Sequence, residues 1–303
     1  MSTGSPRPVR HDTAQQRHTT GQQSPRPGRT RSPRSMRRRS LQTRERHTSR
    51  SWSLRIPALV GIAFIVVPLL ALLARTDWPQ LTTHLSSPVV GQSLRLSALT
   101  TSVTMVLVWV LGTPLAWLLA RSDHPLTAWA RAVITVPLVL PPVVGGVALL
   151  MAYGRRGVVG GPLEEWFGVT VPFTTVAVVM AELFVALPFY VVSVEGAMRG
   201  LDRRVDQIAA TLGAGPVRTF TTVVVPLVLP GIAAGSALAW ARALGEFGAT
   251  ITFAGSFPGR TQTAPLGVYA ALEQDPDAAL ALSVVMLGVS VLVLGALRSR
   301  WLR

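Results

Sequence analysis

The stretch IPALVGIAFIVVPLLALLA, from Ile56 to Ala74, decides the fold class of this chain. Its 19 residues carry no charge, and a helix of that length, rising about 1.5 Å per residue, crosses the roughly 30 Å of hydrocarbon in a bilayer. It is longer than the apolar core of a secretory signal, and no small-x-small cleavage pattern stands out before Asp77. We therefore predict that this stretch is a transmembrane helix.

Five further runs are as long and almost as free of charge: Leu96–Ala120, Ala132–Tyr153, Thr174–Val194, Thr221–Ala241 and Ala278–Leu297. Only one charged residue, Glu182, interrupts them. A soluble protein of 303 residues cannot bury six such runs in one core. Residues 55–303 are therefore predicted to form an all-α, polytopic membrane protein with about six transmembrane helices.

The composition separates this body from a basic N-terminal tail. The chain is 49% hydrophobic and 14% charged, whereas soluble domains carry about a quarter charged residues. All 29 basic residues are arginine, and 14 of them lie in the first 55 positions. We expect residues 1–54, which are otherwise rich in Ser, Thr, Pro, Gln and Gly, to form a disordered cytosolic tail. Because Trp52 is the single Phe, Trp or Tyr residue among these arginines, we expect contact with anionic lipid headgroups rather than nucleic acid.

Several classes of chemistry are excluded by residue type. The chain has no cysteine, and its five histidines are scattered, so no metal site is expected. It also has no lysine, so a phosphate-binding loop of the form GxxxxGK[ST] is impossible. We expect no cofactor and no catalytic residue, and any ATP chemistry would belong to a partner.

The arginines of the short loops predict the orientation in the membrane. With the N-terminus inside, the cytosolic segments hold the tail and the following arginines: Arg121, Arg131, Arg199, Arg203, Arg204, Arg218, Arg298, Arg300 and Arg303. The outer segments hold six arginines, partly offset by seven carboxylates. We therefore expect a protein of the plasma membrane with both termini in the cytosol.

Prolines recur within the predicted spans and indicate kinked helices. Each proline removes a helix hydrogen bond, which in a bilayer is tolerated where protein or a water-lined cavity satisfies the freed carbonyl. Pro141-Pro142, followed by Gly145-Gly146, is the strongest local break. Such kinks favour a pathway with moving walls over a passive anchor.

A loop between the fourth and fifth spans contains a short amphipathic helix, predicted from Asp202 to Leu212. Asp202 is a plausible N-cap, and Gly213 is a plausible C-terminal stop. The apolar residues recur at helical spacing and form one stripe, made of Val205, Ile208, Ala209 and Leu212. An apolar stripe needs a partner, either the lipid headgroup layer or another protein.

This loop resembles the cytoplasmic EAA loop of bacterial ABC importer permeases, whose pattern is E-A-A-x3-G-x9-I-x-L-P. The matching residues are Gln207, Ile208, Ala209, Gly213, Val223, Val225 and Pro226. Gln207 and Ile208 depart from the pattern. The resemblance implies a type I ABC importer transmembrane domain, in which this helix docks on an ATPase subunit and the proline begins the next span. It also implies the partners: two copies of the ATPase, a second copy of this permease and an extracytoplasmic oxyanion-binding protein.

Two further stretches resemble the molybdate branch of that family. They are VPLVLPPVVGGVALLMAYGRRGVVGGPL (136–163) and ARALGEFGATITFAGSFPGRTQTAPLGVYAALEQDPDAALALS (241–283). The resemblance implies an oxyanion substrate, most closely molybdate, with sulfate, thiosulfate or tungstate as alternatives. A secondary transporter driven by an ion gradient is the rival from another class. One acid within the spans is little for a proton relay, and the six spans show no evident inverted repeat.

Candidate pathway residues lie at the outer end of the fifth span. Arg242 and Glu246 are four residues apart, and Gly245, Phe247 and Gly248 surround Glu246. The resemblance favours lining of an oxyanion path over an interfacial ion pair. Glu182 must face protein or water, because a charge facing lipid at mid-span costs about 2.5–3.5 kcal/mol. For Glu182, helix packing and a transport role are both open.

Overall fold

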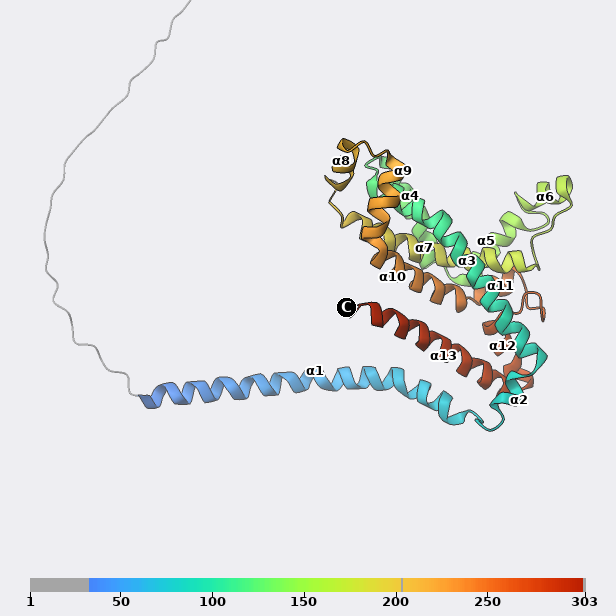
Figure 1. Ribbon diagram of the computed structural model, residues 1–303. Coiled ribbons are helices and arrows are strands. Elements are labelled where there is room, and N and C mark those ends of the chain that lie inside the picture. Colours follow the sequence, from blue (N-terminus) through green and yellow to red (C-terminus); the bar gives the residue numbers. More distant parts are fainter. Residues whose placement is uncertain (1–32, 203, 302–303) are drawn as a thin grey trace, which may run out of the picture. The chain divides into compact units, whose positions relative to one another are not determined.

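The computed structural model describes residues 33–301 except Arg203, with side chains from Leu54 onward apart from a few near the C-terminus. The chain divides into two compact units, Met1–Ile65 and Val66–Arg303, and the second contains all helices from α2 to α13 (Figure 1). No strand occurs among the described residues. Most of the tail predicted for residues 1–54 lies outside this description, so its disorder stays a prediction.

Within the part of the chain that the structure describes, five helical segments are long and apolar enough to cross a membrane. They are Leu54–Arg75 of α1 (Pro33–Arg75), α3 (Pro88–Arg121), α7 (Thr175–Arg199), the run Pro216–Leu244, and Pro276–Val293 of α13 (Pro276–Trp301). The run Pro216–Leu244 combines α9 (Pro216–Thr219), a π-helical turn η1 (Phe220–Val224) and α10 (Val225–Leu244). A bent helix pair makes six if it counts as one span, so the prediction of about six is confirmed.

The third predicted span, Ala132–Tyr153, is not a continuous helix. It is divided into α4 (Pro125–Val139) and α5 (Pro142–Tyr153), which meet at an angle of 119°. Leu140 adopts an extended conformation, with φ −68° and ψ 130°. This is what the residue before a proline prefers, and neither Pro141 nor Pro142 has an amide hydrogen to continue the helix.

The other prolines described within α3 to α10 leave their helices intact. Pro114, Pro137, Pro188 and Pro230 all lie inside helices. The strong break therefore requires the Pro141-Pro142 pair. The short connecting helices are α2 (Leu81–Leu85), α6 (Gly160–Phe167), α8 (Arg204–Thr211), α11 (Gly248–Phe253) and α12 (Ala264–Gln274).

The main core lies where α7 packs between α3 and α10. Tyr190 is fully buried there, and its hydroxyl hydrogen-bonds to Thr113 at 2.7 Å. A Cβ on Gly112 would lie 2.7 Å from the Tyr190 ring, so glycine makes room for that ring. Since lipid tails are as apolar as these side chains, close packing and such hydrogen bonds, rather than water exclusion, hold the helices together.

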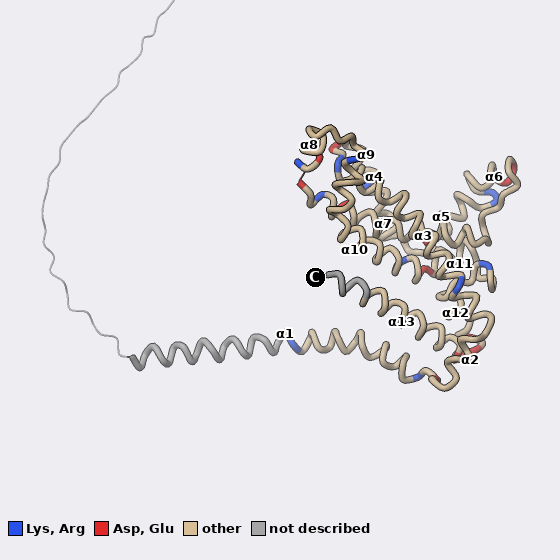
Figure 2. Tube along the Cα trace, viewed as in Figure 1, with Lys and Arg blue, Asp and Glu red and all other residues tan. Residues whose placement is uncertain are grey.

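The bundle of α3 to α13 has two distinct ends. Figure 1 shows α8, α9 and the start of α4 at one end, and α2, α11 and α12 toward the other. Charged residues gather near both ends, and long stretches between them are uncharged (Figure 2). A second, smaller core joins α5, α7 and α11 through residues such as Leu149, Val178 and Phe253. The α8 end and the α11 end are therefore the places to examine for function.

Candidate functional site

The amphipathic helix predicted at Asp202–Leu212 is α8. The Asp202 side chain accepts a hydrogen bond from the Arg204 amide at 2.9 Å, and the Asp202 carbonyl accepts one from the Val205 amide at 3.1 Å. Asp202 thus accepts hydrogen bonds from the first residues of the helix, the role that the sequence suggested for it. The helical residues themselves are Arg204–Thr211, so the prediction was two residues too long at the start and one at the end.

The predicted apolar stripe of α8 does not form a single docking face. Ala209 is buried within the chain, at 7% exposure, and Val205 is half-buried. Ile208 and Leu212 are 59% and 82% exposed, and Gln207 is exposed beside them. The stripe divides because one edge packs on the chain itself. Of the residues predicted to couple to an ATPase within α8 and just after it, Gln207, Ile208 and Leu212 are exposed side chains.

Gly213 ends α8 in the left-handed conformation that glycine favours, with φ 80°. Its amide donates to the Ala210 carbonyl at 3.0 Å, and the Ala214 amide donates to the Ala209 carbonyl at 3.0 Å. The next span then begins at Pro216 rather than at Pro226, which lies in the first turn of α10 after the π-helical turn. The helical run therefore begins ten residues before Pro226, and the role of Pro226 at the membrane entry stays a prediction.

Two groups of ion pairs that the sequence did not predict secure this end of the bundle. Asp206 of α8 pairs with Arg121, the last residue of α3, at 3.0 Å. Glu195 of α7, almost fully buried, pairs with Arg131 at 2.8 Å and with Arg199 at 3.2 Å. Only the Glu195–Arg199 pair had a sequence signal, because its residues are four apart on one helix.

At the opposite end, Arg242 and Glu246 pair across the break between α10 and α11. Arg242 belongs to the last turn of α10, and Glu246 lies in the connection, with its side chain 1% exposed. The second carboxylate oxygen of Glu246 accepts a hydrogen bond from the Ala249 amide at 2.7 Å. One carboxylate therefore joins the end of α10 to the start of α11, with Gly245 exposed between them. Phe247 stacks edge-on against Tyr269, with ring centroids 5.3 Å apart.

Gly248 serves helix packing in this structure. A Cβ on Gly248 would lie 2.8 Å from the Cβ of Pro142, and a Cβ on Gly146 would overlap Thr252 Oγ1. The two glycines thus bring α11 and α5 together at backbone distance. Gly248 itself is buried and does not line an open path here, although the neighbouring Arg242 is a quarter exposed.

Glu182 lies on α7, apart in sequence from the other pathway candidates. Its two carboxylate oxygens accept hydrogen bonds from Thr100 at 2.7 Å and from Thr104 at 2.9 Å, both on α3. The expectation that Glu182 faces protein or water is confirmed, since the residue is 2% exposed. Sequence reasoning missed the two threonines. They are four residues apart, which places them on one face of α3, and Glu182 lies opposite that face.

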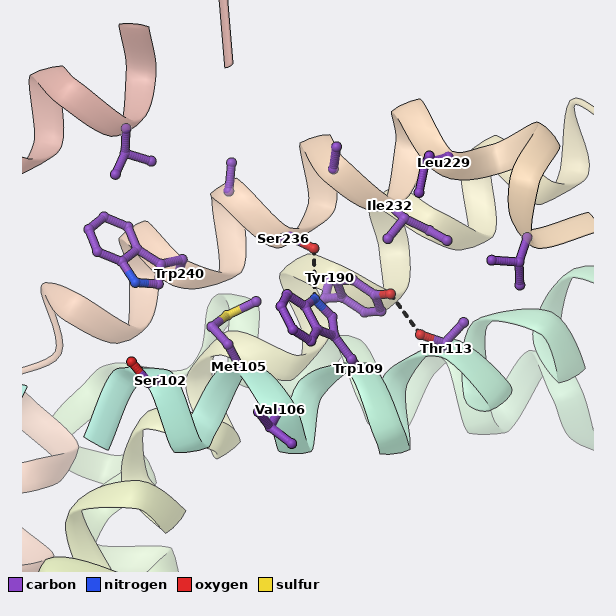
Figure 3. A pocket seen from close by; sticks show the side chains of 14 residues that line it. Ser102, Met105, Val106, Trp109, Thr113, Tyr190, Leu229, Ile232, Ser236 and Trp240 are labelled. Atoms are coloured by element: carbon purple, nitrogen blue, oxygen red, sulfur yellow. Dashed lines mark hydrogen bonds between the residues drawn. The ribbon is translucent and has the colours of Figure 1, made fainter. Parts of the chain in front are cut away.

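A large groove between α3 and α10 is separate from these charged groups (Figure 3). Its volume is about 1110 Å³. Trp109 and Trp240 line it, and Trp109 Nε1 donates to Ser236 Oγ at 2.8 Å. None of the 14 described residues lining the groove is charged, so it offers an oxyanion no cation.

Together these features define a class of protein. A bundle of membrane-spanning helices carries an exposed apolar surface on a short helix at one end and an ion pair at a helix break at the other. These features are those expected of a transport subunit. Residues 112–303 match the family described as the binding-protein-dependent transport system inner membrane component. The chain belongs to this family and is a multi-pass membrane protein.

Related proteins support this placement. The chain is 48% identical over 238 residues to the molybdenum transport system permease protein ModB of Mycobacterium tuberculosis, a match covering 78% of this chain and 90% of that protein. It is 40% identical over 211 residues to the Escherichia coli protein of the same name, covering 70% and 92%. It is 32% identical over 238 residues to a probable sulfate transport system permease protein cysT of Zygnema circumcarinatum, covering 77% and 82%.

A solved structure shares the fold. One chain in the crystal structure of a bacterial alginate ABC transporter, in complex with an alginate pentasaccharide-bound periplasmic protein, superposes with a TM-score of 0.67. The alignment covers 83% of this chain and 94% of that chain at 13% sequence identity. The prediction of an ABC importer transmembrane domain is therefore confirmed at the level of the fold.

Proposed function

We propose that this chain is the membrane-spanning permease subunit of an ATP-driven molybdate importer. The observation that carries the proposal is the 48% identity to a molybdenum permease, over 78% of this chain and 90% of that protein. The 32% identity to a probable sulfate permease makes sulfate a weaker alternative, and thiosulfate and tungstate share its chemistry. The chain is a transport component rather than an enzyme.

The proposed partners follow from the two ends of the bundle. Gln207, Ile208 and Leu212 present the surface that docks on a cytosolic ATPase subunit. One chain supplies one such helix, so two copies of this chain and two ATPases make the complete importer. An extracytoplasmic binding protein delivers the oxyanion to the α11 end. There Arg242 supplies the cation nearest the break between α10 and α11.

An uptake experiment tests the substrate and the energy source together. The experiment uses vesicles that contain the permease and its ATPase, with the binding protein in the surrounding solution that supplies molybdate. These vesicles are expected to accumulate molybdate when ATP is present. Unlabelled tungstate should compete, and sulfate in tenfold excess over molybdate should compete little. Preferential uptake of sulfate would move the protein to the alternative substrate. Uptake that persists with a hydrolysis-dead ATPase would instead favour a secondary transporter.

The orientation of the chain gives a second prediction. If both termini are cytosolic, a reporter enzyme active only outside the cytosol should give no signal when fused after Arg303. The same reporter inserted near Gly160, at the start of α6, should be active, because the span α4–α5 separates this site from the cytosol. Activity of the fusion in cells, corrected for its amount in the membrane, measures the difference. The reverse pattern of signals would invert the proposed topology.

A further inference from the structure

Arg121, at the end of α3, contacts α8 and the connection that precedes it. Arg121 Nε lies 3.0 Å from Asp206 Oδ2, and Arg121 Nη1 donates to the Leu201 carbonyl at 3.4 Å. The Arg121 side chain is 12% exposed and that of Asp206 34% exposed. Water therefore screens this pair less than it screens a surface ion pair, and a charge left without its partner would be costly.

The far half of α3 is attached to the opposite end of the bundle. Ser97 Oγ accepts a hydrogen bond from the Ala264 amide at the start of α12, at 2.7 Å. Thr100 and Thr104 donate to Glu182 on α7. All three contacts are buried or nearly so. The Ser97 contact connects α3 to the segment that follows the Arg242–Glu246 pair, and the two threonines connect it to α7.

Between these attachments α3 is one unbroken helix from Pro88 to Arg121. From Ser97 to Arg121 it makes a rod of about 36 Å at 1.5 Å per residue. Pro114 lies inside it without dividing it. A rigid helix that is attached to other segments at both ends transmits a displacement from one end to the other. The broken pair α4–α5 would instead absorb such a displacement in its bend.

We infer that Arg121 is a positioning residue that transmits movement of α8, through Asp206, into α3 and so to the outer segment around Ala264. The inference rests on the proposed function, in which α8 moves with an ATPase. Arg121 Nε and Nη2 make no hydrogen bond among the described residues, although Nε is within ion-pair distance of Asp206. These two donors of the planar guanidinium can therefore maintain the ion pair with Asp206 when α8 shifts.

The test measures coupling rather than activity alone. The assembled importer in vesicles is compared with Arg121→Ala and with Asp206→Asn, which keeps the side-chain shape and removes the charge. We expect molybdate taken up per ATP hydrolysed to fall about fivefold to tenfold in each, while the ATPase still co-purifies. The double variant R121D/D206R restores the pair in reverse and is expected to recover most of the lost ratio.

The controls separate this inference from its premises. Arg155→Ala removes an arginine whose pairing with Glu164, at 4.0 Å, is exposed and lies far along the chain from α8, and it is expected to keep the wild-type ratio. Unchanged ratios in both single variants would overturn the inference, as would failure of the reversed pair to improve on them. Loss of the ATPase from the single variants would also overturn it, since the pair would then only hold the docking surface. If the wild-type importer takes up no molybdate, the proposed function fails instead.

Discussion

Replacing Gly146 with alanine is expected to destabilise the protein by about 3 kcal/mol or more, at the upper end of what overpacking of a core usually costs. The added Cβ would overlap Thr252 Oγ1 and lie 2.7 Å from the Ala249 carbonyl oxygen and 2.9 Å from the Ala249 Cα. A threonine side chain can rotate away, but the backbone of α11 cannot. The helices α5 and α11 would have to separate, and the small core around Phe253 would open.

Thermal unfolding of the purified protein in detergent, followed by tryptophan fluorescence, measures this effect. The matched control is Gly288→Ala in α13, where a Cβ would meet no atom within 4 Å. There alanine should be neutral or stabilising by up to about 1 kcal/mol, because glycine is the poorer helix former. Equal midpoints for the two variants would show that α5 and α11 do not depend on this close approach.

Replacing Gly213 with valine is expected to reduce molybdate uptake at least about tenfold, while the protein stays in the membrane. No atom lies within 4 Å of the position a Cβ would take, so the effect does not come from a clash. It comes from the backbone: at φ 80° a β-branched residue is strained by about 1–3 kcal/mol. Relieving the strain unwinds the end of α8, and Leu212, the residue beside it, loses its place on the docking surface.

Gly215→Val is the control for that substitution. Gly215 also has open space around it, but its φ is −69° and its ψ 164°, which valine adopts readily before a proline. Uptake, ATP hydrolysis and the amount of ATPase retained are measured for both variants. If Gly213→Val transports as well as Gly215→Val, then the geometry at the end of α8 does not matter for coupling.

The transmembrane helices could be predicted because freedom from charge over some 20 residues is a property of the sequence alone. Helix ends were less certain: α3 begins eight residues before the predicted Leu96, since Ser87 caps it and Pro88 starts it. The break at Pro141 was evident from two adjacent prolines. Its angle was not, because the angle depends on how α5 packs against α11 through Gly146 and Gly248.

The candidate site was predictable only where its residues are neighbours in the chain. Arg242 and Glu246 are one helical turn apart, and their pairing followed from that spacing. Arg121 and Asp206 are 85 positions apart, and no periodicity relates them. Ala209 was placed on the docking face because the pattern of α8 shows which residues share a face, and not which part of that face the chain itself covers.

The bend between α4 and α5 has a consequence for where water can reach within the bilayer. Neither helix alone, at 15 and 12 residues, spans about 30 Å of hydrocarbon. In the last turn of α4, the Val136 carbonyl accepts a hydrogen bond from the Leu140 amide. The carbonyls after it have no amide of the same helix to bind. Val139 is 88% exposed, and Pro141 is exposed as well. Hydrocarbon cannot solvate such carbonyls, so this level of the membrane must be hydrated or covered by another protein surface once the importer is assembled.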